Sequence, residues 1–206
     1  MDPIVERDLN EIGLHKIIGV DEAGRGSLIG PVVASSVMLP ANHKIEGIND
    51  SKLVSPNKRK EIAGLIFERA LEVRVSFIMN GVIDKINILN ATKLAIKETL
   101  VAFRIRPDIV VIDGLFSFKD EYMLPYAYQL LPKGDTLSEN IAAASIIAKT
   151  TRDAWVVQVS DQYPEYNFAQ HKGYGTEAHF DALVKYGPCP IHRRSFSLKG
   201  KRLGDF

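Results

Sequence analysis

Two apolar segments joined by a glycine-rich turn stand at residues 16–39, which read KIIGVDEAGRGSLIGPVVASSVML. Lys16–Val20 is predicted to be a short buried strand, and Gly30–Leu39 a second one, rich in valine and small residues. The intervening Asp21–Ile29 contains two glycines, Gly24 and Gly26, a composition that favours a turn. We therefore expect the two strands to pair as a hairpin-like unit that starts an α/β sheet.

Helices and strands alternate along the rest of the chain. Ser55 followed by Pro56 is typical of a helix start, and Pro164 after a long apolar pattern is typical of a helix end. This order predicts an α/β domain with a mixed sheet and flanking helices. The further predicted strands are Val73–Met79, Ile109–Ile112 and Tyr126–Leu131, and the predicted helices are Ser55–Ala70, Ile83–Phe103, Ser138–Tyr163 and Thr176–Tyr186.

The chain is expected to form one catalytic domain, at residues 1–186, and a basic C-terminal segment, at 187–206, that packs on the domain or extends it. With 206 residues, of which 46% are hydrophobic, it is long enough to bury a core. From His171 to Phe206 seven Lys and Arg stand against three acids, which predicts a helical, basic appendage suited to phosphates. On charge alone, a solvated basic tail is the alternative.

The composition also argues against several classes of protein. The longest apolar runs, such as Gly30–Leu39, are too short to span a bilayer, and Met1–Asn10 carries no apolar signal segment. The single cysteine, Cys189, cannot form an internal disulfide, so a reducing, cytoplasmic setting is expected. We expect a monomer without a membrane partner.

Four acids are the candidate catalytic residues. Asp21 and Glu22 follow the first predicted strand, and Asp113 follows the strand Ile109–Ile112. Because strand ends of one sheet meet at one edge, Asp21 and Asp113 could lie together, whereas Glu22 points the opposite way unless the backbone bends. Asp153 lies on a predicted helix, four residues after a lysine, so an exposed ion pair is its alternative role.

Carboxylates in this pattern suit hard divalent cations. Mg²⁺ or Mn²⁺, with two ions during catalysis, could activate a water and stabilise the leaving oxygen of a phosphodiester. Histidine and cysteine do not have the spacing of a zinc site, and the phosphate-binding and serine-nucleophile motifs are missing from the sequence. The sequence therefore favours a metal-dependent nuclease.

A series of motifs in this chain together resembles prokaryotic type 2 ribonuclease H (ribonuclease HII). The motifs follow one another over nearly the whole chain, and as a set they are highly specific. They are Gly19–Gly26 with Gly30–Ala34, Asp50–Leu53, Ile86–Thr92, Asp113–Gly114, Ile141–Lys149, Thr151–Asp153, His171–Thr176 and His192–Phe196.

The resemblance implies a ribonuclease H-like fold with a mixed five-stranded sheet. It implies that Asp21, Glu22, Asp113 and Asp153 bind the metal ions and are catalytic. It further implies cleavage 5′ of a ribonucleotide, in RNA–DNA hybrids and in duplex DNA with embedded ribonucleotides, giving a 3′-hydroxyl and a 5′-phosphate. The residues implied or considered for substrate binding are Gly24, Arg25 and Gly26 at the 2′-hydroxyl, Tyr174 at the neighbouring deoxyribose, and Lys52, Lys149, Lys172, Arg193 and Arg194 at phosphates.

The chain departs from the family pattern at Ser27, where proline is usual, and a small serine is expected to cost little. Only about fifteen residues precede the first predicted strand, which argues against a type 3 enzyme with its extra N-terminal domain. A resolvase or integrase core would share the clustered acids but lack the Gly24–Gly26 turn and the His171–Tyr174 motif. A non-catalytic binding module would not need all four acids.

Overall fold

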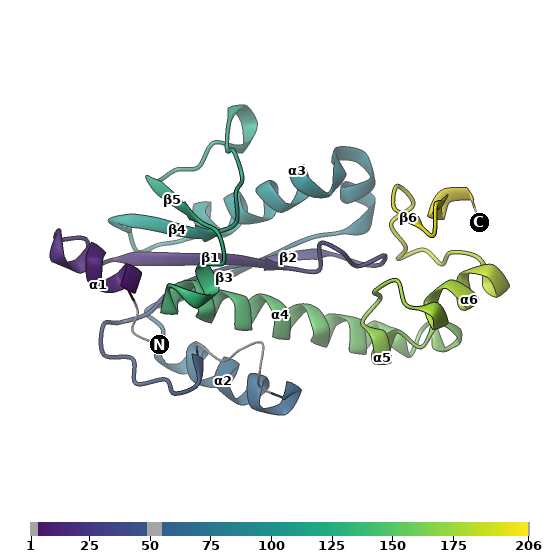
Figure 1. Cartoon of the computed structure of the whole chain (residues 1–206), viewed down its shortest axis with the longest axis horizontal. Coiled ribbons are helices and arrows are strands. Elements are labelled where there is room, and N and C mark those ends of the chain that lie inside the picture. The colour runs from purple at the N-terminus through teal and green to yellow at the C-terminus, as the bar shows by residue number, and fades with distance from the viewer. Residues whose placement is uncertain (1–3, 49–54, 206) are drawn as a thin grey trace.

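The computed structural model describes residues 4–48 and 55–205, and its centre is a five-stranded mixed sheet of order β3-β2-β1-β4-β5. Strand β1 pairs antiparallel with β2 and parallel with β4, and β3 and β5 form the two edges (Figure 1). The strands are β1 (Ile17–Ala23), β2 (Val32–Met38), β3 (Glu72–Ile78), β4 (Ile109–Asp113) and β5 (Tyr128–Leu131).

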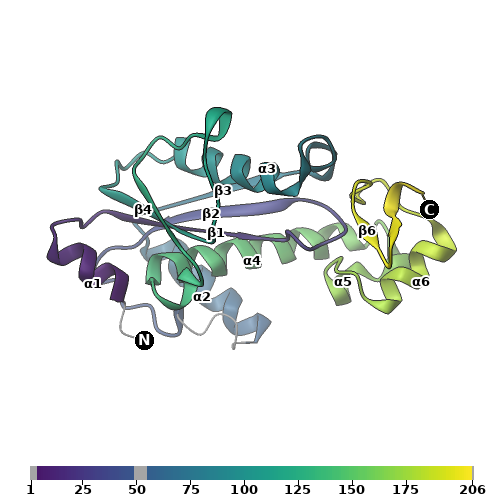
Figure 2. The ribbon, with the colours of Figure 1, turned by 45° about the horizontal axis from the view of Figure 1, so that its top comes forward.

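Helices cover both faces of this sheet, as Figures 1 and 2 show. Helix α3 lies on one face, and α4 and α2 lie on the other, while α5, α6 and the short hairpin β6–β7 gather beyond one end of the sheet. The bounds are α1 (Ile4–Glu11), α2 (Pro56–Arg69), α3 (Asn80–Val101), α4 (Glu139–Ser160), α5 (Phe168–His171), α6 (Glu177–Tyr186), β6 (Ser197–Leu198) and β7 (Lys201–Arg202). In the described ranges, no helix is both long and apolar enough to cross a membrane.

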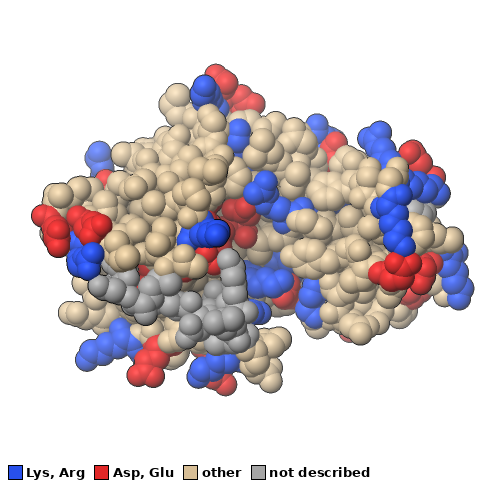
Figure 3. Space-filling view, in the orientation of Figure 1, with Lys and Arg blue, Asp and Glu red and all other residues tan. Residues whose placement is uncertain are grey.

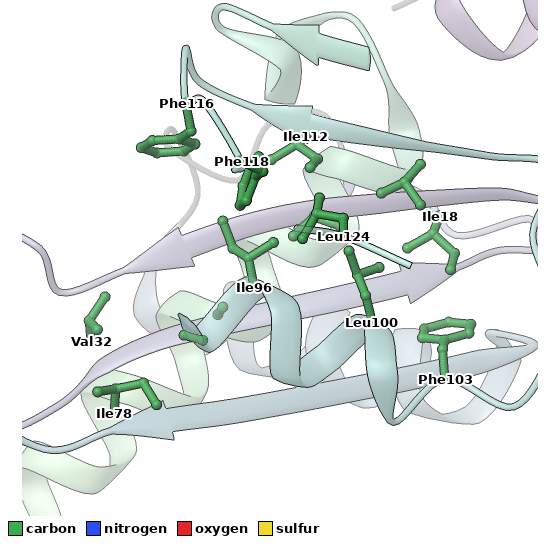
Figure 4. Close-up of a cluster of buried hydrophobic side chains, with 14 of the residues drawn as sticks. Ile18, Val32, Ile78, Ile96, Leu100, Phe103, Ile112, Phe116, Phe118 and Leu124 are labelled. Atoms are coloured by element: carbon green, nitrogen blue, oxygen red, sulfur yellow. The ribbon is translucent and has the colours of Figure 1, made fainter. Parts of the chain in front are cut away.

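Successive side chains of β1 point to opposite faces of the sheet, so they pack into two different layers. Ile18 points into the core beneath α3, together with Ile96 and Leu100 (Figure 4), and Val20 belongs to the same core. On the opposite face, a Cβ added to Gly19 would lie 2.0 Å from the carbonyl carbon of residue 140 in α4. Glycine therefore lets α4 approach β1 closely, and the next residue on that face is an acid.

Two sequence predictions about element bounds are wrong. Strand β1 does not end at Val20 but runs to Ala23, because its residues Asp21 to Ala23 continue the antiparallel pairing with β2. The predicted helix Ile83–Phe103 is interrupted at Asn87, whose φ of 65° and ψ of 166° are not helical. The Asn87 side chain accepts a hydrogen bond from the backbone N–H of Asn90, as an N-cap does, so a second helical segment starts there.

The C-terminal elements share an apolar cluster with the glycine-rich turn. Leu28 and Ile29 of the turn pack with Leu183 of α6 and with Cys189 and Leu203 beyond it. The segment after Gly187 contains the two-residue strands β6 and β7. This cluster fixes the position of the turn relative to the C-terminal part of the chain.

Candidate active site

Asp21 and Asp113 lie side by side on the two central parallel strands. Val20 of β1 pairs with Ile112 of β4, so the two aspartates are the next residues along neighbouring strands. Asp21 is buried and accepts a hydrogen bond from the backbone N–H of Glu22, 2.7 Å away. Asp113 accepts one from the backbone N–H of Gly134, at 2.9 Å. Two carboxylates are thus held at the same end of the sheet.

Glu22 lies near these aspartates, although it directly follows Asp21 on the strand and successive strand residues point to opposite faces. Its Oε1 accepts a hydrogen bond from Nη1 of Arg25 at 3.1 Å, which turns one oxygen towards the glycine-rich turn. Its Oε2 is buried and has no hydrogen-bond partner within residues 4–48 and 55–205. A buried carboxylate oxygen without a partner is costly unless a cation or a proton satisfies it.

The charge states of these acids reflect burial and mutual repulsion. Burial raises the pKa of Asp21 well above its usual range, and the nearby Glu22 and Asp113 raise it further, while a hydrogen bond with Ser145 lowers it. Burial also raises the pKa of Glu22 to about 7, against the opposing effect of Arg25. A divalent cation would neutralise this repulsion, so the donor set fits a metal that prefers oxygen ligands.

Asp153 is placed differently from the other three predicted acids. It lies on α4, where its carboxylate is paired with Nζ of Lys149 at 3.1 Å and with Nη1 of Arg152 at 3.4 Å. In the described part of the chain, no three histidine, cysteine or acidic side chains form a ready-made metal cage. The structure therefore brings Asp21, Glu22 and Asp113 together, whereas Asp153 is held on α4 in ion pairs with Lys149 and Arg152.

A cavity of about 440 Å³ opens over the three clustered acids. Lys149 of α4 and Tyr174, from the segment after α5, stand in its wall, so residues distant in sequence meet there. The cavity is large enough to admit a nucleotide-sized group. Its lining residues are Asp21, Glu22, Ala23, Gly24, Arg59, Asp113, Ser145, Ile146, Lys149 and Tyr174.

The glycine-rich turn and Tyr174 face each other at the rim of this cavity. Gly24 has a φ of 90°, which favours glycine, and a Cβ added to Gly26 would lie 3.8 Å from the Tyr174 ring. Tyr174 is 37% exposed, and Nζ of Lys149 lies 5.4 Å from its ring centre. One flat ring thus stands opposite a stretch of backbone that lacks side chains at Gly24 and Gly26.

The predicted phosphate-binding residues have separate locations. Arg193 is fully buried and donates to the backbone oxygens of Gly30 at 3.0 Å and Arg25 at 2.9 Å. A direct phosphate contact by Arg193 does not fit this burial, because its guanidinium supports the turn from within the protein. Arg194 is exposed, and its Nη2 donates to the carbonyl oxygen of Pro188 at 3.1 Å.

Two further lysines complete that set. Nζ of Lys172 donates to the carbonyl oxygen of Ala169, and Lys52 lies outside the described residues. Near the middle of the face drawn in Figure 3, Lys and Arg side chains border a small group of acidic ones. Positive charge is therefore available next to acidic groups on this face, as binding of a polyanion through metal ions requires.

Sequence reasoning did not assign a role to three side chains around the site. Ser145 bonds to Asp21, and the fully buried Arg152 and Ser27 bond to each other beneath the glycine-rich turn. One signal for Arg152 was available in the sequence. It lies four residues after Ala148 and seven after Ser145, on the face of α4 that packs on the sheet.

The sheet order, the flanking helices and the acids on the central strands define the class of this protein, the ribonuclease H-like α/β fold. A family model for ribonuclease HII matches residues 18–199. A ribonuclease HII from Caldicellulosiruptor bescii is 46% identical over 94% of this chain and 91% of its own length. The chain belongs to the ribonuclease HII family, and it is a hydrolase, an endoribonuclease of the ribonuclease H type that acts on RNA–DNA hybrids.

Solved structures agree with this assignment. Ribonuclease H2 from Pyrococcus horikoshii superposes with a TM-score of 0.74 at 27% identity, over 88% of this chain and 94% of that one. Bst-RNase HIII, solved in complex with Mn²⁺, has a TM-score of 0.67 at 22% identity, over 82% of this chain and 70% of that one. The second likeness is one of fold alone.

Proposed function

We propose that this protein cuts the phosphodiester 5′ of a ribonucleotide, both in RNA–DNA hybrids and in DNA duplexes with embedded ribonucleotides. The products are a 3′-hydroxyl and a 5′-phosphate. One observation carries this proposal: the acids Asp21, Glu22 and Asp113, the Tyr174 side chain and Gly24 of the turn line the same cavity. A site of this kind can read a sugar and cut the adjoining phosphate in one binding event.

Asp21, Glu22, Asp113 and Asp153 would hold Mg²⁺ or Mn²⁺, with two ions during catalysis. When bound, such ions supply an activated water and stabilise charge on the leaving oxygen of the phosphodiester. The raised pKa values of Asp21 and Glu22 support this role, as does Oε2 of Glu22, which has no hydrogen-bond partner among the described residues. Carboxyl groups of this kind bind a cation in exchange for protons.

The turn and the ring would supply selectivity for the sugar. Backbone groups of Gly24, Arg25 and Gly26 would contact the ribose 2′-hydroxyl, the one group that distinguishes RNA from DNA at a given site. Tyr174 would pack on the sugar of the neighbouring deoxynucleotide. Their closeness, with Gly26 next to the ring, supports a shared role in recognising a ribose followed by a deoxyribose.

Cationic side chains would position the substrate without reading its sequence. Lys149 stands in the cavity wall and has the best placement for a phosphate contact. Lys52, Lys172 and Arg194 remain candidates along the path of the duplex. For Arg193 we propose support of the turn instead, because its side chain is buried.

Replacing one clustered acid tests this proposal. We expect Asp21→Asn or Asp113→Asn to lower the cleavage rate at least about a hundredfold, because a metal-binding charge is lost while the shape is kept. Substrate binding, measured by fluorescence anisotropy, should stay within a few-fold of the wild type. Asp161→Asn, at the exposed end of α4, is the matched control and should cut normally. Full activity of either site variant would overturn the assignment.

A further inference from the structure

Arg152 is a fully buried cation that touches three parts of the proposed site. Its Nη2 donates to Oγ of Ser27 in the turn, and its Nη1 lies 3.4 Å from Oδ1 of Asp153. Its guanidinium carbon is 5.4 Å from the centre of the Tyr174 ring. A Cβ added to Gly24 would lie 3.1 Å from its Nε, so the turn rests directly on this side chain.

Ser27 extends these contacts to the segment that carries Tyr174. Its buried hydroxyl lies 3.2 Å from the carbonyl oxygen of Gly173 and 3.1 Å from that of Ile29. The single hydroxyl proton can serve one of these oxygens at a time, while the lone pairs accept from Arg152 and from the backbone N–H of Ile29 at 3.3 Å. One small side chain thus joins the turn, the helix α4 and the tyrosine segment.

The chemistry of arginine suits such a junction. A guanidinium offers several donors in a rigid planar fork, so one side chain can hold an oxygen of the turn and an oxygen of Asp153 at fixed separation. Burying a cation costs free energy, which its bonds to Ser27 and Asp153 and its place over the Tyr174 ring offset. An ammonium group on a flexible stem could not make the same two bonds in a fixed plane.

We propose that Arg152 is a positioning residue that fixes the Gly24–Gly26 turn relative to Tyr174 and Asp153, and so couples recognition of the ribose–deoxyribose step to cleavage. This inference rests on the proposed function. Because Arg152 is buried, it acts through Ser27, Tyr174 and Asp153 and does not touch the substrate. Its loss should therefore affect substrates that need the turn and the ring together more than substrates that need only the turn.

Two substrates separate these cases. One is a DNA duplex with a single ribonucleotide, in which a deoxyribose follows the ribose, and the other is an RNA–DNA hybrid of the same sequence. We expect Ser27→Ala to lower the ratio of kcat/KM on the first to that on the second about tenfold, the factor expected for one lost hydrogen bond to a charged group. Arg152→Lys should lower the ratio at least as far, although it keeps the charge.

The double variant tests whether the two residues act through one contact. The effect of Ser27→Ala combined with Arg152→Lys on the ratio should be smaller than the product of the two single effects, because both changes remove the same contact between Ser27 and Arg152. Ser160→Ala removes a buried hydroxyl that donates to the carbonyl oxygen of Val157 in the same helix at 2.7 Å, and it should leave the ratio unchanged. Thermal melting of each variant reports its folding separately.

The outcomes are distinct. A lowered ratio in both single variants, with a combined effect in the double variant smaller than the product of the two, supports the proposal. Three results would overturn it: an unchanged ratio, an equal loss of activity on both substrates, or effects of the two changes that multiply in the double variant. The proposed function would still stand in these cases, provided that the wild type cuts the substrates. If the wild type cuts neither substrate, the proposed function fails and this inference fails with it. Should Arg152→Lys not fold, the ratio for Ser27→Ala decides alone.

Discussion

At the scale of one residue, Glu22 shows how burial makes the charged form of an acid in the site unfavourable. Its pKa is raised to about 7 mainly by burial, and that of Asp21 is raised as well. In the metal-free protein the folded state therefore holds protons that the unfolded chain releases. The resulting stability is present below about pH 4.5 and is lost as pH rises through about 7.

Asp21→Asn should accordingly stabilise the metal-free protein at pH 8. Asparagine removes one of several neighbouring charges and keeps the size of the side chain, so we expect a gain of about 1 kcal/mol, or roughly 2–4 °C in Tm. Calorimetry in the presence of a chelator measures this, with exposed Asp161→Asn as the control. A lower Tm for Asp21→Asn would contradict the unfavourable burial and charge repulsion that we attribute to these acids.

The closeness of Asp21 and Asp113 was more predictable than the environment of the candidate site residues. The positions of Asp21 and Asp113 near the ends of apolar strands indicated that they would meet, and the register of β1 and β4 confirms their adjacency. The burial of Arg193 could not be predicted, because its partners, the carbonyl oxygens of Gly30 and Arg25, lie more than 160 residues earlier in the sequence. The hydroxyl contacts of Ser27 likewise depend on segments about 125 and 146 residues away.

At the scale of elements, the closeness of β1 and α4 decides where Asp21 lies. A Cβ at Gly19 would overlap the backbone of α4, so Gly19→Ala should destabilise the fold by about 3 kcal/mol and displace the acid two residues on. Gly64→Ala, in α2 with open space around it, should instead stabilise by about 1 kcal/mol. Urea unfolding measures both, and equal effects of the two variants would contradict this role for Gly19.

Helix starts were predictable because their signals are local. The side chains of Ser55, Ser138 and Thr176 each accept a backbone hydrogen bond at the start of the helix predicted there. The extension of β1 was not predictable, because it depends on pairing with β2 through the acids themselves. The break at Asn87 carried a local signal, an asparagine able to cap the segment after it, that apolar periodicity concealed.

At the scale of the whole molecule, three neutral histidines tie the C-terminal part to the tyrosine segment. The backbone N–H of Cys189 donates to Nδ1 of His192, so the proton of His192 is on Nε2, which donates to Nε2 of His179 at 3.0 Å. Nδ1 of His179 then donates to the carbonyl oxygen of Tyr174 at 3.0 Å. His171 stacks on His179, with ring centres 4.7 Å apart.

These histidines should resist protonation in the folded protein. Burial lowers the pKa of His179 to about 4 and that of His192 to about 3, and it lowers the pKa of His171. The unfolded chain takes up these protons near pH 6.5, so the stability that the histidines contribute is present above about pH 6.5 and is lost as pH falls towards 4. NMR titration of the imidazole signals measures this, and titration of His179 near pH 6.5 in the folded protein would contradict it.

The central claim concerns one hydroxyl group, and one comparison tests it most directly. The wild-type protein is incubated with Mg²⁺, and then with Mn²⁺, together with a DNA duplex that carries a single ribonucleotide or with the same duplex made entirely of DNA. We predict cleavage of the first duplex alone, at the phosphodiester 5′ of the ribonucleotide, with a 3′-hydroxyl on the upstream product. Equal cleavage of both duplexes would contradict recognition of the 2′-hydroxyl by the Gly24–Gly26 turn.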